Sequence, residues 1–105
     1  MKSLRRAVVI VLDGVGCGAL PDAADYADEG ADTLGHVARE CGGLSLPNLG
    51  RWGLGCLGEI AGVALVARPD AAFGRMAERS AGKDTTTGHW EICGLATTDP
   101  FAVFD

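Results

Sequence analysis

The chain has 105 residues, of which 48% are hydrophobic and 22% are charged, as in an ordinary globular domain. Its formal net charge of −5 argues against binding to nucleic acid, which needs a basic protein face. The longest apolar run, residues 7–12, is far shorter than the roughly 20 residues of a membrane helix. Because Asp13 ends that run, a signal peptide is also not expected. The composition therefore predicts a protein without a membrane or nucleic-acid partner.

The four cysteines are widely and irregularly spaced, and none forms a C-x-x-C pair: Cys17, Cys41, Cys56 and Cys93. This spacing argues against a structural zinc site, and a core of ordinary composition needs no disulfides. We expect four reduced thiols and a cytoplasmic location.

The first predicted element is a strand over residues 6–12, because a continuous β-branched, apolar run suits the centre of a parallel sheet. Asp13 follows it, and glycines at positions 14, 16 and 18 let a ligand approach the backbone. Asp13 is a candidate metal ligand; the alternative is an aspartate that caps the turn. Gly14, Gly16 and Ala19 also fit the spacing of a dinucleotide fingerprint, but that motif needs a helix to open at the loop.

Residues 21–32 are polar and acidic and predict a solvated loop rather than a calcium site, whose ligand spacing differs; the acidic residues are Asp22, Asp25, Asp28, Glu29 and Asp32. Asp32 or Thr33 can then cap a helix that runs to about Cys41 and ends at two glycines. Pro47 can open a second, short helix that carries Trp52.

Residues 71–80 predict a second strand, and Asp84 or Thr85 can cap a third helix that runs to about Leu95. The resulting order of strands and helices is typical of the α/β class, with a mainly parallel sheet. In such sheets, ligands bind beyond the carboxyl ends of the strands, which is where Asp13 and Thr85 lie in the predicted order.

Three threonines, residues 85–87, stand at the start of the third predicted helix. A helix N-terminus offers unpaired N–H groups to phosphate, and a hydroxyl beside a bound dication can act as a nucleophile. Thr85 and Asp13 would then form half of a phosphoryl-transfer site. The alternative is a threonine-rich helix cap followed by a buried Trp90 and a surface Glu91, with His89 satisfied by a hydrogen bond and Lys83 solvated.

Four segments together resemble the N-terminal part of phosphopentomutases, manganese-dependent members of the alkaline phosphatase superfamily. They are residues 8–16 (VVIVLDGVG), 30–36 (GADTLGH), 46–50 (LPNLG) and 82–91 (GKDTTTGHWE). The last is the specific one, since the first is shared with cofactor-independent phosphoglycerate mutases. The resemblance implies an alkaline-phosphatase-like core, with Asp13 as a metal ligand and Thr85 as the residue that carries the phosphoryl group and faces the metals.

The resemblance further implies interconversion of (deoxy)ribose 1-phosphate and (deoxy)ribose 5-phosphate. A phosphorylated Thr85 donates to one sugar hydroxyl, the bisphosphate reorients, and its other phosphate returns to Thr85. The cofactors implied are two Mn²⁺ ions, about 4 Å apart as in two-metal sites, and a sugar bisphosphate as activator.

Family members are several times longer, so the resemblance implies that residues 1–105 are one N-terminal segment of the metal-binding core. The cap domain and the C-terminal core, which supply the sugar site and the other metal ligands, have no counterpart here. We therefore expect the isolated segment to bind metal weakly, to be inactive, and to fold marginally or self-associate. Two alternatives stay open: a phosphoglycerate mutase-like or metal-dependent phosphatase segment, and a non-catalytic domain that binds an anion. The oligomeric state is also left open.

Overall fold

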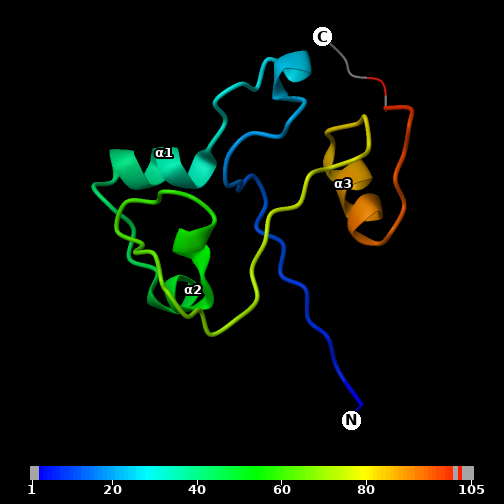
Figure 1. Cartoon of the computed structure of the whole chain (residues 1–105). Helices are drawn as coiled ribbons and strands as arrows, with labels where there is room; N and C mark the ends of the chain where they lie inside the picture. Colours follow the sequence, from blue (N-terminus) through cyan, green and yellow to red (C-terminus); the bar gives the residue numbers. More distant parts are fainter. Residues whose placement is uncertain (1–2, 101, 103–105) are drawn as a thin grey trace.

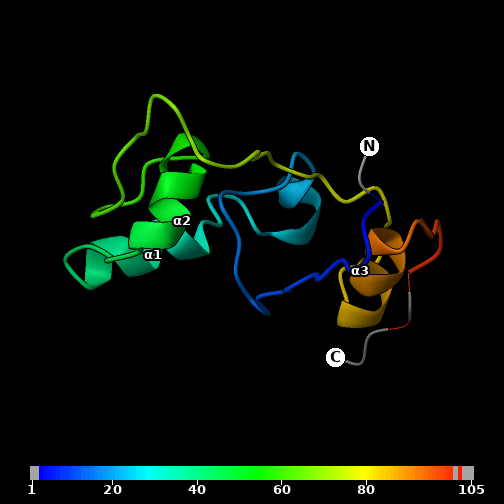
Figure 2. The same ribbon diagram turned by 90° about the horizontal axis from the view of Figure 1, so that it is seen from below.

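Short helices and long extended segments make up the computed structural model, which describes residues 3–100 and residue 102. The elements in chain order are η1 (Ala23–Tyr26), α1 (Thr33–Glu40), α2 (Pro47–Trp52), η2 (Leu54–Cys56) and α3 (Thr85–Ile92), where η marks a 3-10 turn. Figures 1 and 2 show α1 and α2 together on one side and α3 on the other, joined by an extended segment. The helices α1 and α2 therefore do not pack directly against α3.

The first predicted helix is confirmed as α1. Asp32 is its N-cap, and Asp32 Oδ1 accepts a hydrogen bond from the Gly35 N–H at 3.2 Å. The helix ends where Gly42 adopts a φ of 73°, a conformation that glycine enters without steric cost. The Gly43 N–H then donates to the Ala38 carbonyl at 2.7 Å, which is the closing hydrogen bond of a Schellman cap.

The second predicted helix is confirmed as α2, with Pro47 in its first turn. Proline suits that position because its missing N–H would have no partner there. Gly53, at a φ of 110°, ends α2 and leads directly into η2.

The small hydrophobic core lies on the side of α1 and α2. Ala38, Ile60 and Val63 are buried, and four leucines pack against them: Leu34, Leu44, Leu46 and Leu54. Ile60 and Val63 form an isolated antiparallel bridge, and the Leu44 N–H donates to the Ala61 carbonyl at 2.8 Å. The core is thus closed by a turn folded back on α1.

The third predicted helix is confirmed in place but is shorter than expected. Asp84 is its N-cap, and it ends at Ile92 rather than near Leu95. The reason is Gly94, which has a φ of 100°. This left-handed residue lets the Leu95 N–H bond back to the Trp90 carbonyl at 2.8 Å, which terminates the helix.

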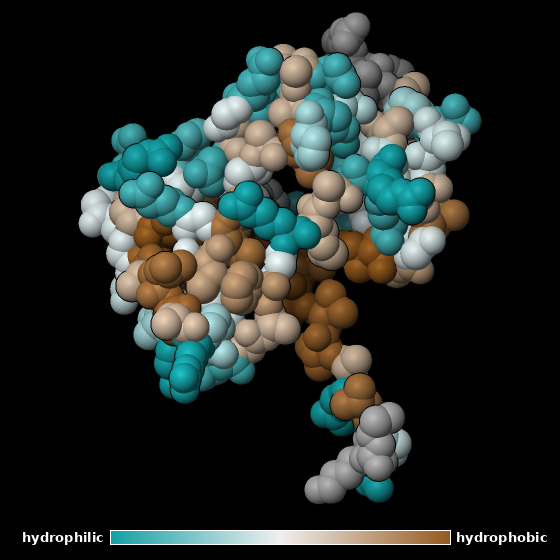
Figure 3. Space-filling model, in the orientation of Figure 1, coloured by the Kyte–Doolittle hydropathy of each residue, from teal (hydrophilic) through white to brown (hydrophobic). Residues whose placement is uncertain are grey.

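Neither predicted strand is confirmed, since no strand is assigned within residues 3–100. Residues 6–12 run extended and exposed, with Val8 74% and Ile10 80% accessible, and Figure 3 shows their apolar side chains on the surface. A β-strand exists only as part of a hydrogen-bonded ladder, and a sequence pattern cannot supply the neighbouring strand. The predicted parallel sheet therefore stays a prediction.

The molecule is open for its size. Its radius of gyration is 16.1 Å, whereas a compact domain of 100 residues has about 13 Å. The described helices include none that is long and apolar enough to span a membrane.

Candidate functional site

The start of α3 is organised by the Asp84 carboxylate. Asp84 Oδ2 accepts from the Thr87 N–H at 2.9 Å, and Asp84 Oδ1 accepts from the Thr87 hydroxyl at 2.6 Å. These bonds, that of the hydroxyl foremost, hold the pKa of Asp84 below its ordinary value, because they favour the charged form. Asp84 is therefore an ionised cap that fixes the first turn of the helix.

This cap distinguishes the three threonines from one another. Thr87 is 1% exposed, and its hydroxyl is committed to Asp84. Thr85 and Thr86 are exposed on the same turn. A nucleophile must reach its substrate, so Thr87 is excluded from that role, and Thr85 keeps the accessibility that the sequence prediction needs.

His89 lies one turn beyond Thr85. Its Nδ1 is 2.7 Å from the Thr85 carbonyl oxygen. A carbonyl only accepts hydrogen bonds, so Nδ1 must carry the proton. His89 is a satisfied hydrogen-bonding residue, as the alternative interpretation of this segment expected.

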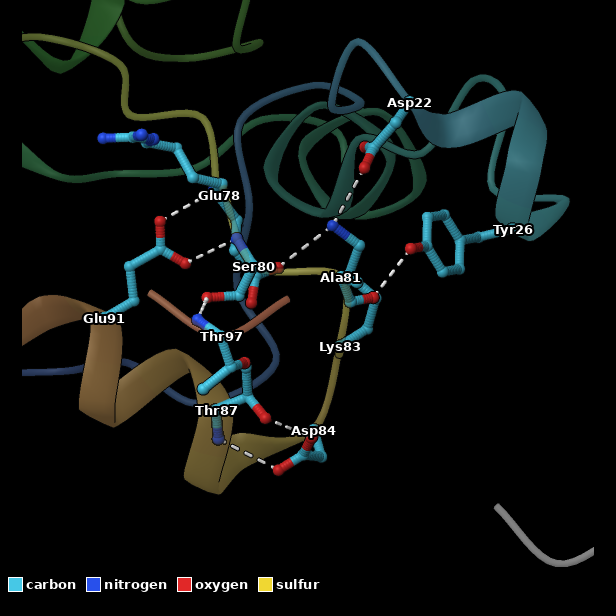
Figure 4. A network of polar contacts seen from close by, with 11 residues as sticks. Asp22, Tyr26, Glu78, Ser80, Ala81, Lys83, Asp84, Thr87, Glu91 and Thr97 are labelled. Carbon is cyan, nitrogen blue, oxygen red and sulfur yellow. Dashed lines mark hydrogen bonds and ion pairs between the residues drawn. The ribbon is translucent and has the colours of Figure 1, made fainter. Parts of the chain in front are cut away.

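Glu91 ties the far end of α3 to the extended segment before it (Figure 4). Glu91 Oε1 and Oε2 accept from the backbone N–H groups of Arg79 and Ser80, at 2.6 and 3.0 Å. These bonds, that from Arg79 foremost, lower the pKa of Glu91. The carboxylate thus satisfies two backbone donors at the end of the extended segment and fixes it against α3.

Ser80 extends the same support to the segment after α3. Ser80 is 2% exposed, and its hydroxyl accepts from the Thr97 N–H at 2.9 Å. Sequence spacing gave no signal for Glu91 or Ser80, because their partners are backbone groups brought near by the tertiary structure. The alternative interpretation of this segment is wrong in one part, since Trp90 is not buried but 41% exposed.

Asp13 stands at the opening of the glycine-rich loop, exposed to solvent. The loop that follows is tied to α1: the Gly18 N–H donates to Asp32 Oδ1, and the Leu34 N–H donates to the Gly16 carbonyl, both at 3.2 Å. Asp32 thus caps α1 and holds the loop behind Asp13 at the same time.

The dinucleotide-binding alternative for this loop is wrong. No helix opens between Gly14 and Ala19, and the first helical element of the described residues is η1, which begins at Ala23. Without a helix N-terminus at the loop, the motif lacks the N–H groups that hold a pyrophosphate.

The donor set fits a hard divalent cation in kind but is incomplete in number. Asp13 and Thr85 offer a carboxylate and a hydroxyl, the oxygen ligands that Mn²⁺ and Mg²⁺ favour. Among the described residues no three His, Cys, Asp or Glu side chains come together as a metal site. A site built on Asp13 and Thr85 would therefore need further ligands.

An open cleft of about 590 Å³ lies against α3, lined among others by Glu78, Lys83, Asp84 and Glu91. Its three carboxylates against one ammonium make it a poor site for phosphate.

The chain is similar along nearly its whole length to curated bacterial proteins named phosphopentomutase. It is 59% identical to that of Syntrophotalea carbinolica over 104 residues, which cover 99% of this chain and 26% of the relative. It is 60% identical to that of an Anaeromyxobacter species over 100 residues (95% and 26%) and 56% identical to that of Dictyoglomus thermophilum over 101 residues (96% and 26%). No protein-family model matches the chain.

These relatives confirm the resemblance to phosphopentomutase. The chain spans about a quarter of the length of the curated relatives it matches. The match to the Syntrophotalea protein covers both the Asp13 loop and the Thr85 segment, since it leaves out only 1% of the chain.

Proposed function

We propose that this chain carries part of the metal-binding core of a phosphopentomutase, which interconverts (deoxy)ribose 1-phosphate and (deoxy)ribose 5-phosphate. The observation that carries the proposal is the 59% identity to a phosphopentomutase across both chemistry-bearing loops. The names of the relatives favour this substrate over the phosphoglycerate of the first alternative.

Thr85 is the proposed nucleophile. Its exposed position in the first turn of α3 supports this role, because a nucleophile must be accessible to its substrate and the positive end of a helix dipole attracts phosphate. In the forward step, a sugar hydroxyl attacks the phosphorus of phosphorylated Thr85. The new sugar O–P bond forms, the bond from phosphorus to Thr85 Oγ1 breaks, and the proton that the sugar hydroxyl gives up is balanced by one that Thr85 Oγ1 takes up. The bisphosphate then reorients, and its other phosphate is returned to Thr85 Oγ1.

Asp13 is the proposed metal ligand, together with Thr85. Manganese, when bound, would favour deprotonation of the Thr85 hydroxyl and shield the incoming phosphate charge. The fixed glycine loop behind Asp13 supports this role, because a ligand on an anchored loop loses little conformational freedom on binding.

The cytoplasm is the proposed location. All four cysteines are free thiols in the structure, as is usual for proteins of reducing compartments.

Phosphosite mapping of the protein purified from the cells that make it tests the proposal. We expect phosphate on Thr85 after treatment with ribose 1,5-bisphosphate and Mn²⁺, and its loss on addition of ribose 5-phosphate. Thr85→Val should abolish the label, whereas Thr86→Val, the matched exposed neighbour, should keep it. Asp13→Asn should weaken Mn²⁺ binding and Asp25→Asn should not. Label that survives in Thr85→Val would refute the assignment, and anion binding without any label would favour the non-catalytic alternative.

A further inference from the structure

Lys83 sits at the centre of a polar cluster that nothing in the proposed chemistry uses (Figure 4). Its Nζ lies 3.1 Å from Asp22 Oδ2 and 3.2 Å from Glu78 Oε2. The same ammonium stands 4.8 Å from the centre of the Tyr26 ring, within the range of a cation–π contact. The Tyr26 hydroxyl in turn donates to the Ala81 carbonyl at 2.7 Å. We call these four side chains, Asp22, Tyr26, Glu78 and Lys83, the Lys83 clamp.

The charged side chains of the clamp are partly shielded from water. The side chains of Lys83, Asp22 and Glu78 are 25%, 37% and 20% exposed, so solvent screens their attraction less than that of a fully exposed pair. The Lys83 ammonium therefore holds both carboxylates at once.

The clamp joins the two segments on which the proposed function depends. Asp22 and Tyr26 flank or lie in η1, which follows the loop of Asp13. Lys83 stands two positions before Thr85, in the turn that leads into α3. The glycine loop is itself anchored to α1 through Asp32. A continuous set of contacts thus runs from the loop behind Asp13 to the turn before Thr85.

We propose that Lys83 is a positioning residue, whose contacts with Asp22, Glu78 and Tyr26 hold the Thr85 turn in register with the loop that follows Asp13. The importance of this positioning rests on the proposed function, in which Asp13 and Thr85 face one metal ion. The contacts of the clamp themselves do not depend on that function. Lys83 contacts neither Thr85 nor a reacting group, and it acts through the backbone that it fixes.

Amide hydrogen exchange of the metal-free chain tests the clamp. Lys83→Met removes two partly exposed ion pairs and a cation–π contact. We expect amide exchange at Gly82, Thr87 and Gly88 to become roughly five- to tenfold faster in this variant. Asp22→Asn should give a smaller rise, and Lys83→Arg should restore protection by keeping the charge. The matched control is Arg51→Met, which removes an exposed cation whose side chain bonds Asn48 within α2.

Mn²⁺ broadening of backbone NMR signals tests the consequence. In the wild-type chain, one ion should broaden amides of both the Gly14–Gly18 loop and the first turn of α3; in Lys83→Met it should broaden only one of them. The proposal would be overturned if amide exchange in Lys83→Met stayed within twofold of that in Arg51→Met, or if Lys83→Arg did not restore protection. Absence of broadening in the wild-type chain would instead count against the proposed metal site, and the exchange ratios alone would then decide the clamp.

Discussion

The Asp32 carboxylate accepts hydrogen bonds from both α1 and the glycine loop, so its removal should destabilise both segments. Asp32→Ala removes the N-cap of α1 and the acceptor of the Gly18 N–H. Loss of an N-cap costs about 1 kcal/mol, and loss of one hydrogen bond to a charged, part-buried acceptor costs about 1 kcal/mol more. We therefore expect local opening of α1 and of the glycine loop to become easier by about 2 kcal/mol, which is about a 30-fold rise in amide exchange.

The assay is amide exchange followed by NMR at Gly18, Gly35 and His36. Asp32→Asn is the conservative variant: asparagine caps helices about as well as aspartate, so protection should be nearly kept. Asp25→Ala is the matched control, because Asp25 is an exposed aspartate of the same acidic segment.

Two results would refute this reasoning. Exchange in Asp32→Ala within twofold of Asp25→Ala would mean that the carboxylate does not stabilise either element. A rise at Gly35 without one at Gly18 would mean that the glycine loop is held by other contacts, and the link between the cap and the Asp13 loop would be lost.

Three further predictions concern α3 and the core. Thr87→Val should raise the pKa of Asp84 toward 3.8, because the hydroxyl is the main cause of its lowering; Thr87→Ser should not, and a carbon-detected NMR titration would distinguish them. Asp84 and Glu91 both have lowered pKa values. Their contribution to stability is therefore complete above about pH 4.5 and is lost as the pH falls through the lowered pKa values. Amide-exchange protection of α3 that is unchanged at pH 2 would contradict this prediction. Gly62→Ala should lower the free energy of unfolding by at least about 1–3 kcal/mol, because φ is 85° and a Cβ would meet the Leu44 backbone. Gly42→Ala, at a φ of 73° with open space around it, should lower it less. Equal unfolding midpoints of the two variants in urea would contradict this prediction.

Local chemistry explains what could be predicted from the sequence. Asp32 and Asp84 each begin a helix by accepting a hydrogen bond from the backbone N–H three residues on, and Pro47 suits a first turn because it lacks an N–H. Gly42 and Gly94 end helices by their own conformation. α3 ends before Leu95, the predicted end, because Gly94, one residue earlier, adopts a left-handed conformation. The candidate residues Asp13 and Thr85 were also identified from short motifs, and the relatives confirm the family that those motifs resemble.

The strands could not be predicted in the same way, because a strand is defined by a neighbour and not by its own residues. The apolar run at residues 6–12 has the composition of a buried strand, yet it lies exposed. In residues 71–80 the N–H groups of Arg79 and Ser80 are taken by the Glu91 carboxylate.

The sequence by itself determined where the three helices begin and predicted which loops carry chemistry, since caps, turns and motifs act over a few residues. Only the tertiary structure decided that Thr87 is the buried threonine, that Glu91 ties α3 to the segment before it, and that Lys83 pairs with Asp22. Lys83 and Asp22 are 61 positions apart in the chain, and no local pattern encodes a contact of that span. The physical reason is that such pairs form only when folding brings both partners together in space, so their existence depends on the path of the whole chain.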